Sequence, residues 1–166
     1  LGIRAALTGH LVFSTVHTND AASGFTRLLN WNVEPFLIAS TVKGILAQRL
    51  VRRICKECKE PHEPSREELR MVGVDEDESI KSFVGKGCLS CRNTGFKGRI
   101  GIYELLLVDA AISELVLEQA PGYKIREQAR KNGMTTLLED GIIKIERGDT
   151  TISEVYETLG TTKIML

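Results

Sequence analysis

The cysteines constrain the fold of this chain more than any other feature. All four of them fall into two Cys-x-x-Cys pairs, Cys55 with Cys58 and Cys88 with Cys91, and 29 residues separate the pairs. Two such pairs can present four thiolates at the corners of a tetrahedron, which is the geometry of a closed Zn²⁺ site with Zn–S bonds of ~2.3 Å. A complete shell of four sulfurs leaves no open position for chemistry, so the sequence predicts a structural zinc site.

Two other states of these cysteines remain open at this point. Two disulfides would require an oxidising compartment, and the sequence shows no signal peptide that would indicate export. Four unrelated free thiols are the second alternative. His62 follows Cys58 by four residues and could replace a ligand, but four sulfurs suffice, and we interpret it as a surface residue.

The composition argues against a membrane-spanning chain and gives no overall charge that would favour nucleic acid. The chain is 42% hydrophobic and 27% charged, as an ordinary globular protein is. No apolar run reaches the ~18–20 residues that cross a bilayer. The net charge is zero, but residues 1–60 carry eight Lys/Arg and four acids (+4), and the rest carries 14 and 18 (−4). The basic first part is compatible with an anionic ligand or an acidic neighbouring subunit.

The first 54 residues alternate in the manner of an α/β protein. The chain opens within a helix that ends near Leu7, without an initiator Met, which predicts a fragment of a longer protein. A buried strand is predicted at Leu11–Val16, and Asp20 is a suitable N-cap for the next helix. Further elements are predicted in this part: helices Ala21–Trp31 and Pro35–Leu46 and a strand Ala47–Cys55.

The rest of the chain is predicted to be strand-poor and then helical. Ser65 and Glu68 form a capping-box pattern, which predicts a short helix to about Val72. Residues 95–109 are glycine-punctuated and then rich in Ile, Tyr and Leu, which favours a strand or hairpin. Four helices are predicted after it: Ala110–Glu118, Gly122–Asn132, Leu137–Glu146 and Ser153–Leu159.

A polar cluster follows the predicted strand Leu11–Val16. In open α/β sheets ligands bind beyond the carboxyl ends of strands, so His17 could contact a phosphate while Thr18 and Asn19 orient it or a water. The plainer alternative is that His17 is a structural hydrogen-bonding residue. The sequence has no glycine-rich GK[ST] loop, so it does not transfer phosphoryl groups unaided.

The basic residues beside the first cysteine pair support a different class of function. These are Arg49, Arg52, Arg53, Lys56 and Lys59. A zinc-stabilised module that binds nucleic acid, or only protein, without catalysis is therefore the alternative. Phe96 and Tyr103 are the few rings near the second pair on which bases could stack. Steeply salt-dependent binding would identify a nucleic-acid module.

The cysteine pairs and the polar cluster after Val16 lie in longer strings that resemble one family. These strings are RAALTGHLVFSTVHTNDA, NVEPFLIASTVKGILAQRLVRRIC, GCLSCRNTGFKGRIGIYELL and GMTTLLEDGIIKIERGDTTISEV. They resemble the ATPases that power bacterial type II secretion and type IV pilus assembly, from Arg4 to about Leu159. The resemblance implies an α/β fold in three segments: the C-terminal part of a RecA-like P-loop ATPase domain (1–54), a tetracysteine zinc subdomain (55–107) and a small helical C-terminal region (108–166).

The resemblance also implies roles for individual residues. LVFSTVHTND matches the family's histidine box, which makes His17 a catalytic sensor of the γ-phosphate of ATP. Thr18, Asn19 and Arg49 would join it in binding ATP with Mg²⁺. Cys55, Cys58, Cys88 and Cys91 match a structural zinc module that distinguishes these branches from pilus-retraction ATPases. Candidates for nucleotide or inter-subunit contacts are Arg49, Arg52, Arg53 and Arg99.

For the intact protein the resemblance implies a homo-hexameric ATPase whose Walker A and Walker B motifs lie before Leu1, so that the fragment alone is inactive. Its partners would be an inner-membrane platform protein and cytoplasmic secretion or pilus components, with no direct nucleic acid. The location would be cytoplasmic, peripheral to the inner membrane through those partners. The resemblance covers protein secretion, pilus assembly and DNA uptake alike.

Overall fold

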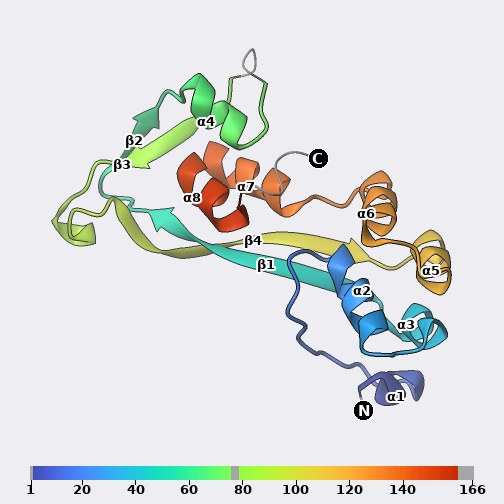
Figure 1. Ribbon diagram of the computed structural model, residues 1–166. Helices are drawn as coiled ribbons and strands as arrows, with labels where there is room; N and C mark the ends of the chain where they lie inside the picture. The colour runs from blue at the N-terminus through green and yellow to red at the C-terminus, as the bar shows by residue number, and fades with distance from the viewer. Residues whose placement is uncertain (1, 76–78, 161–166) are drawn as a thin grey trace. The chain divides into compact units, whose positions relative to one another are not determined.

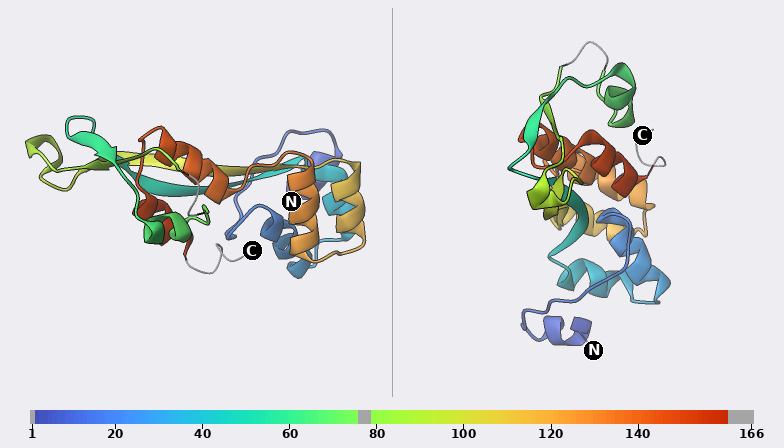
Figure 2. Two further views of the ribbon diagram at one scale, coloured as in Figure 1. Left: turned by 90° about the horizontal axis from the view of Figure 1, so that it is seen from above. Right: turned by 90° about the vertical axis from the view of Figure 1, so that its left-hand side faces the viewer.

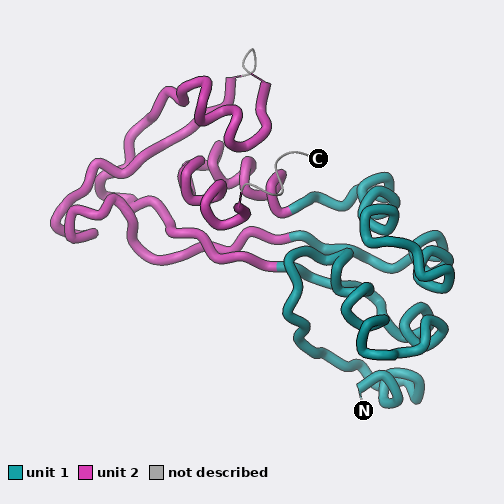
Figure 3. The backbone as a smooth tube through the Cα atoms, viewed as in Figure 1, with its two compact units in different colours: residues 1–47, 104–136 teal, residues 48–103, 137–166 magenta. Residues whose placement is uncertain are grey.

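The computed structural model describes residues 2–75 and 79–160, and the chain divides into two compact units (Figure 1 and Figure 3). Unit 1 comprises residues 1–47 and 104–136, and unit 2 comprises residues 48–103 and 137–166. The units cut across the three consecutive segments expected from the sequence, because two long strands each contribute to both units. Residues 161–166 of the third expected segment lie outside the described residues.

These two strands, β1 (Gly44–Ile54) and β4 (Phe96–Leu107), pair with each other. Backbone hydrogen bonds run from Val108 N–H to the Lys43 carbonyl (3.0 Å) and from Cys55 N–H to the Gly95 carbonyl (2.9 Å), so the strands are antiparallel. They lie side by side along their length (Figure 1 and Figure 2). Both of these strands were predicted, although β1 begins at Gly44, where the sequence predicted the last turn of a helix.

Unit 1 packs helices against the strand ends that it contains. Its helices are α1 (Gly2–Leu7), α2 (Ala22–Asn30), α3 (Pro35–Thr41), α5 (Ala110–Leu117) and α6 (Gly122–Lys131). α3 packs on α5, α2 packs on α6, and α5 lies beside α6 (Figure 2). The largest fully buried side chains of the unit are Phe25, Ile38, Leu106, Ile112 and Ile125.

The predicted strand Leu11–Val16 is wrong. The segment is extended but belongs to neither described sheet, and its side chains are not buried: Leu11 is 82% exposed and Phe13 is 89% exposed. A strand needs a neighbouring backbone to accept and donate its hydrogen bonds, and no described segment provides one here. The β-prone, apolar composition of the segment was therefore not sufficient to form a strand.

Unit 2 combines a small sheet with α-helices and one short 3-10 helix. Its further elements are β2 (Lys59–His62), α4 (Arg66–Met71), β3 (Ser82–Gly85), the short 3-10 helix η1 (Leu89–Cys91), α7 (Leu137–Glu146) and α8 (Ile152–Leu159). β2 pairs antiparallel with β3, with Lys59 opposite Gly85 and His62 opposite Ser82. The apolar core joins Val72 after α4 to Ile145 of α7 and Val155 of α8.

Several local predictions are confirmed in both units. The Ser65 hydroxyl accepts the Glu68 N–H (3.2 Å) and the Glu68 carboxylate accepts the Ser65 N–H (2.8 Å), so the capping box starts α4 as predicted. The Asp20 carboxylate accepts the Ser23 N–H (2.8 Å) at the start of α2. The four helices predicted after β4 are all present, within a residue of the predicted bounds. Among the described residues no helix has both the length and the apolar character needed to cross a membrane.

Candidate metal centre and histidine segment

The chain folds so that both cysteine pairs meet within unit 2. Cys55 follows β1, and a turn closed by the Cys58 N–H on the Cys55 carbonyl (3.3 Å) returns the chain into β2. The second pair brackets η1, where the Cys91 N–H donates to the Cys88 carbonyl (3.2 Å). The Cys55 N–H to Gly95 carbonyl bond then ties the first pair to the chain beyond the second.

The spacing of the four sulfurs fits a tetrahedral metal site. All four lie within 4.8 Å of one another. The Sγ–Sγ distances are 3.8 Å for Cys55 and Cys88, 3.9 Å for Cys58 and Cys91, and 3.7 Å for Cys88 and Cys91. A tetrahedron with Zn–S bonds of ~2.3 Å has edges of about 3.8 Å. The four thiols are therefore arranged as zinc ligands are. They come from two segments of the chain, residues 55–58 and 88–91, that are far apart in the sequence.

The surroundings of the cluster favour thiolate at one ligand in particular. The Cys91 sulfur accepts backbone N–H groups of Cys88 (3.2 Å) and Gly95 (3.3 Å). Burial raises the pKa of this thiol, but these two donors outweigh burial, and the pKa falls to about 6. Burial raises the pKa of the Cys58 thiol to about 12. A bound divalent cation would deprotonate both, because metal coordination favours the thiolate.

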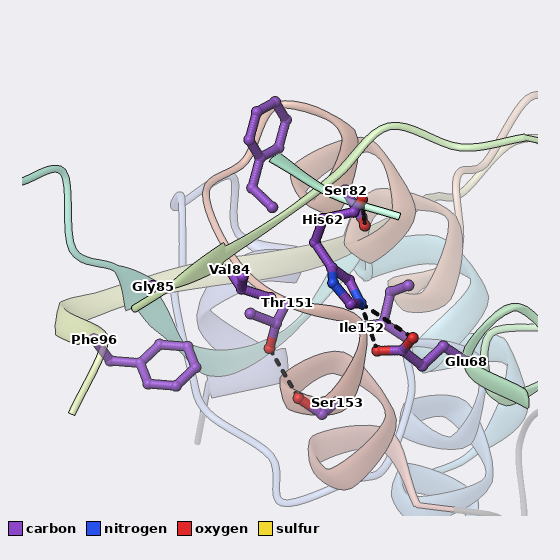
Figure 4. Close-up of a pocket in the computed structure, with 10 residues that line it drawn as sticks. His62, Glu68, Ser82, Val84, Gly85, Phe96, Thr151, Ile152 and Ser153 are labelled. Carbon is purple, nitrogen blue, oxygen red and sulfur yellow. Dashed lines mark hydrogen bonds and ion pairs between the residues drawn. The ribbon is translucent and has the colours of Figure 1, made fainter. Parts of the chain in front are cut away.

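The alternatives to metal fit the geometry less well. A disulfide requires sulfurs ~2.05 Å apart, and the four cysteines are free. His62 is not part of the cluster: its Nε2 lies 3.1 Å from each Glu68 carboxylate oxygen. That pair lines a cavity of about 180 Å³ in unit 2, together with the hydrogen-bonded hydroxyls of Thr151 and Ser153 (Figure 4). None of the predicted catalytic, nucleotide-binding or metal-binding residues lines this cavity, but Phe96, named above as a ring for base stacking, does.

The histidine segment, residues 17–19, lies in unit 1. His17 and Asn19 are exposed and Thr18 is half-buried, and the Thr18 hydroxyl donates to the Asp20 carbonyl (3.0 Å). The fourth nucleotide-binding candidate, Arg49, belongs to unit 2, where its guanidinium donates to the Gln48 carbonyl (3.0 Å). The His17, Thr18 and Asn19 part of the predicted site is thus contiguous, whereas Arg49 comes from the other unit.

Two of the other candidate arginines have ion-pair partners within unit 2. Arg52 forms an ion pair with Glu154, and Arg53 lies 3.2 Å from an Asp149 carboxylate oxygen. Arg99 is exposed on β4. Sequence reasoning gave Asp20 only a capping role and missed Arg126, which forms an ion pair with it. The charges of the two residues are opposite, but 106 residues separate them, and no local pattern connects them.

Three comparisons place the chain among known proteins. The family model described as type II/IV secretion system protein matches residues 1–157. The chain is 47% identical over 157 residues to the type IV pilus assembly ATPase PilB of Thermus thermophilus, covering 93% of this chain and 18% of that protein. It is 42% identical over 155 residues to the type II secretion system ATPase E of Vibrio cholerae, covering 93% of this chain and 31% of that protein.

A solved structure shares the fold. The crystal structure of the pilus retraction motor PilT with bound ADP matches 99% of this chain and 36% of that chain, with a TM-score of 0.63 and 22% sequence identity. The chain thus has an α/β fold similar to that of PilT and spans less than a third of the length of the two curated relatives named above. Because the family model matches nearly the whole chain, the chain belongs to the type II/IV secretion system protein family.

Proposed function

We propose that this chain is part of an ATP-driven motor for type II protein secretion or type IV pilus assembly, in which it carries the RecA-like histidine segment and a structural zinc module. The observation that carries the proposal is one family match that spans both the segment around His17 and all four cysteines. The curated relatives that match 93% of the chain are named as ATPases of these two systems.

His17 is proposed to act as the γ-phosphate sensor. Catalysis in P-loop ATPases is mostly positioning and charge stabilisation at the phosphates, with Mg²⁺ bound to the nucleotide. An exposed imidazole such as that of His17 can donate a hydrogen bond to a terminal phosphate, a bond that is present with ATP and absent with ADP. Such a differential contact can bias two arrangements of neighbouring subunits. Thr18 and Asn19 are proposed to bind the same nucleotide.

The tetracysteine cluster is proposed to hold Zn²⁺ in a structural role. Four thiolates complete the coordination shell, so the ion would fix the ends of β1 and β4 and leave no position open for substrate. Zinc binding would thereby stabilise unit 2, as structural zinc does in small domains.

We further propose that the intact protein is a homo-hexamer that acts on an inner-membrane platform protein from the cytoplasmic side. The basic first part of the chain is compatible with contacts to an acidic neighbouring subunit. Each of the two rings considered for base stacking has one cation near it, although Tyr103 remains 41% exposed. The Arg52 guanidinium lies 4.3 Å from the Phe96 ring centre, and the Lys144 ammonium lies 5.5 Å from that of Tyr103.

The test is the substitution His17→Ala in the full-length protein that carries this chain. We expect ATP turnover to fall on the order of a hundredfold, the loss typical of removing one hydrogen-bond donor to developing charge. His62→Ala is the matched control, because it removes an imidazole that pairs with Glu68 in the other unit and should leave turnover unchanged. Circular dichroism and zinc content should match the unsubstituted protein in both variants. Unchanged turnover in His17→Ala would refute the sensor role.

A further inference from the structure

Two buried carboxylates hold the chain immediately after the histidine segment. Asp20 is 4% exposed, and its carboxylate accepts the Ser23 N–H at 2.8 Å and pairs with the Arg126 guanidinium. The next residue, Ala21, donates its N–H to the Glu104 carboxylate at 2.8 Å, and Glu104 is 3% exposed. Consecutive residues are thus fixed by side chains from two distant elements of unit 1.

These anchors connect the histidine segment to the rest of unit 1. Arg126 lies on α6 and Glu104 on β4, which are 106 and 83 residues away from their partners in the sequence. α2, which begins just after Asp20, also packs on α6. The Thr18 hydroxyl, which donates to the Asp20 carbonyl, extends the fixed backbone to the residue next to His17.

The ion pair is not arranged for stability alone. Among the described residues, the Nε–H of Arg126 is buried without a hydrogen-bond partner. An unsatisfied buried donor lowers stability, and an ion pair whose arginine side chain is 32% exposed contributes little on its own because water screens it. A better explanation is that the pair sets the position of the backbone that it grips.

We infer that Asp20 and Arg126 are positioning residues, which hold the 18–20 backbone on α6 and thereby place the imidazole of His17. This inference rests on the proposed sensor role of His17. A sensor that separates ATP from ADP by one hydrogen bond depends on sub-ångström placement, because a shift of about 1 Å at a reacting group can cost on the order of a hundredfold in rate. Asp20 is three residues from His17, close enough to control its backbone and too buried to contact a nucleotide itself.

The experiment measures ATP turnover and thermal unfolding of Asp20→Asn and Arg126→Gln in the full-length protein, singly and together. Asp140→Asn is the matched control, since the Asp140 carboxylate also accepts a backbone N–H (Tyr103, 2.8 Å) and pairs with a cation (Lys144), but in unit 2. We expect each single variant in unit 1 to lower kcat by about tenfold or more with little change in KM for ATP. Asp140→Asn should lower the melting temperature to a similar extent with kcat unchanged.

The double variant tests whether Asp20 and Arg126 affect kcat through the same interaction. If they do, its kcat equals that of the worse single variant, whereas multiplying losses would show independent action and overturn the inference. Equal losses of kcat in Asp20→Asn and Asp140→Asn, in proportion to lost stability, would also overturn it. If His17→Ala lowers turnover while Asp20→Asn matches the unsubstituted protein, the sensor role stands and only the positioning role of Asp20 is wrong. If His17→Ala has no effect, the sensor role fails and positioning fails with it.

Discussion

The ion pair between β1 and α8 allows a quantitative test of the fold of unit 2. The Glu154 side chain is only 8% exposed, and three donors of one residue point at its carboxylate: the backbone N–H of Arg52 (2.9 Å), its Nε–H (2.7 Å) and its Nη2–H. Glu154→Gln keeps the size of the side chain but removes its charge and places an amide NH₂ against the guanidinium. We expect this substitution to destabilise the chain.

The expected magnitude follows from the hydrogen bonds that are weakened. A hydrogen bond to a charged group contributes about 1.5–3 kcal/mol, and the 55% exposure of the Arg52 side chain lets water replace part of the loss. We therefore expect a loss of about 2 kcal/mol, which for a chain of this size lowers the melting temperature by about 4–8 °C. Urea unfolding followed by far-UV circular dichroism near neutral pH measures it. Glu157→Gln, three residues along the same helix and exposed, is the control and should change stability by less than about 0.5 kcal/mol.

The same ion pair predicts how the loss of stability in Glu154→Gln depends on pH. Burial raises the pKa of the Glu154 carboxyl, but the hydrogen bonds and charge of Arg52 outweigh burial and leave the pKa below its ordinary value of 4.5. A carboxyl with a lowered pKa contributes stability that is present above the ordinary value and lost as the pH falls through the lowered one. The difference in the free energy of unfolding between Glu154→Gln and the unsubstituted chain should therefore narrow below about pH 4.5. A difference that is absent at neutral pH, or that stays constant on acidification, would refute this account of the pair.

Three further outcomes test the candidate metal centre and two other features of unit 2. Metal analysis of the purified chain should find one zinc per chain, and Cys91→Ser should lower zinc affinity and the melting temperature together; full zinc content in that variant would exclude this sulfur as a ligand. Gly85→Ala should cost more than about 2 kcal/mol in urea unfolding, because its Cβ would lie 2.1 Å from the Gly95 carbonyl oxygen, whereas Gly98→Ala, with φ +80° and nothing within 4 Å, should cost only about 1 kcal/mol for its backbone conformation. Ser65→Ala should cost about 1 kcal/mol by removing the N-cap of α4, and an unchanged urea midpoint would contradict that capping role.

Features whose cause is local were predictable from the sequence. The capping box at Ser65 and Glu68 is complete within four residues, and the C-terminal helices have apolar residues at helical spacing. The cysteine cluster was also predictable, because two Cys-x-x-Cys pairs state the ligand geometry almost directly. The capping box and the helices depend on residues close together in the chain, and each cysteine pair is itself local, although the two pairs are 29 residues apart.

Features that depend on distant partners were not predictable in the same way. β2 and β3 were missed, since KEPH and SFVG are four residues each and do not alternate clearly between apolar and polar residues. Asp20 is suited to a cap by its residue type, but its ion pair with Arg126 exists only because α6 packs on α2. The pairing partner that a strand at Leu11–Val16 would need is equally non-local, and the described residues contain none.

The exposed extended segment has a practical consequence for handling this chain. Leu11–Val16 reads LVFSTV, with high β-propensity and without any charge, proline or glycine. Six-residue segments of this composition are an aggregation hazard when they are accessible, because they can stack between molecules into cross-β structure, and neither folded core covers this one. Concentrated preparations should therefore associate through intermolecular β-pairing while both cores are still folded, so that turbidity or a thioflavin signal precedes thermal unfolding. For this chain, colloidal behaviour and fold stability are separate properties, and a buffer that improves one need not improve the other.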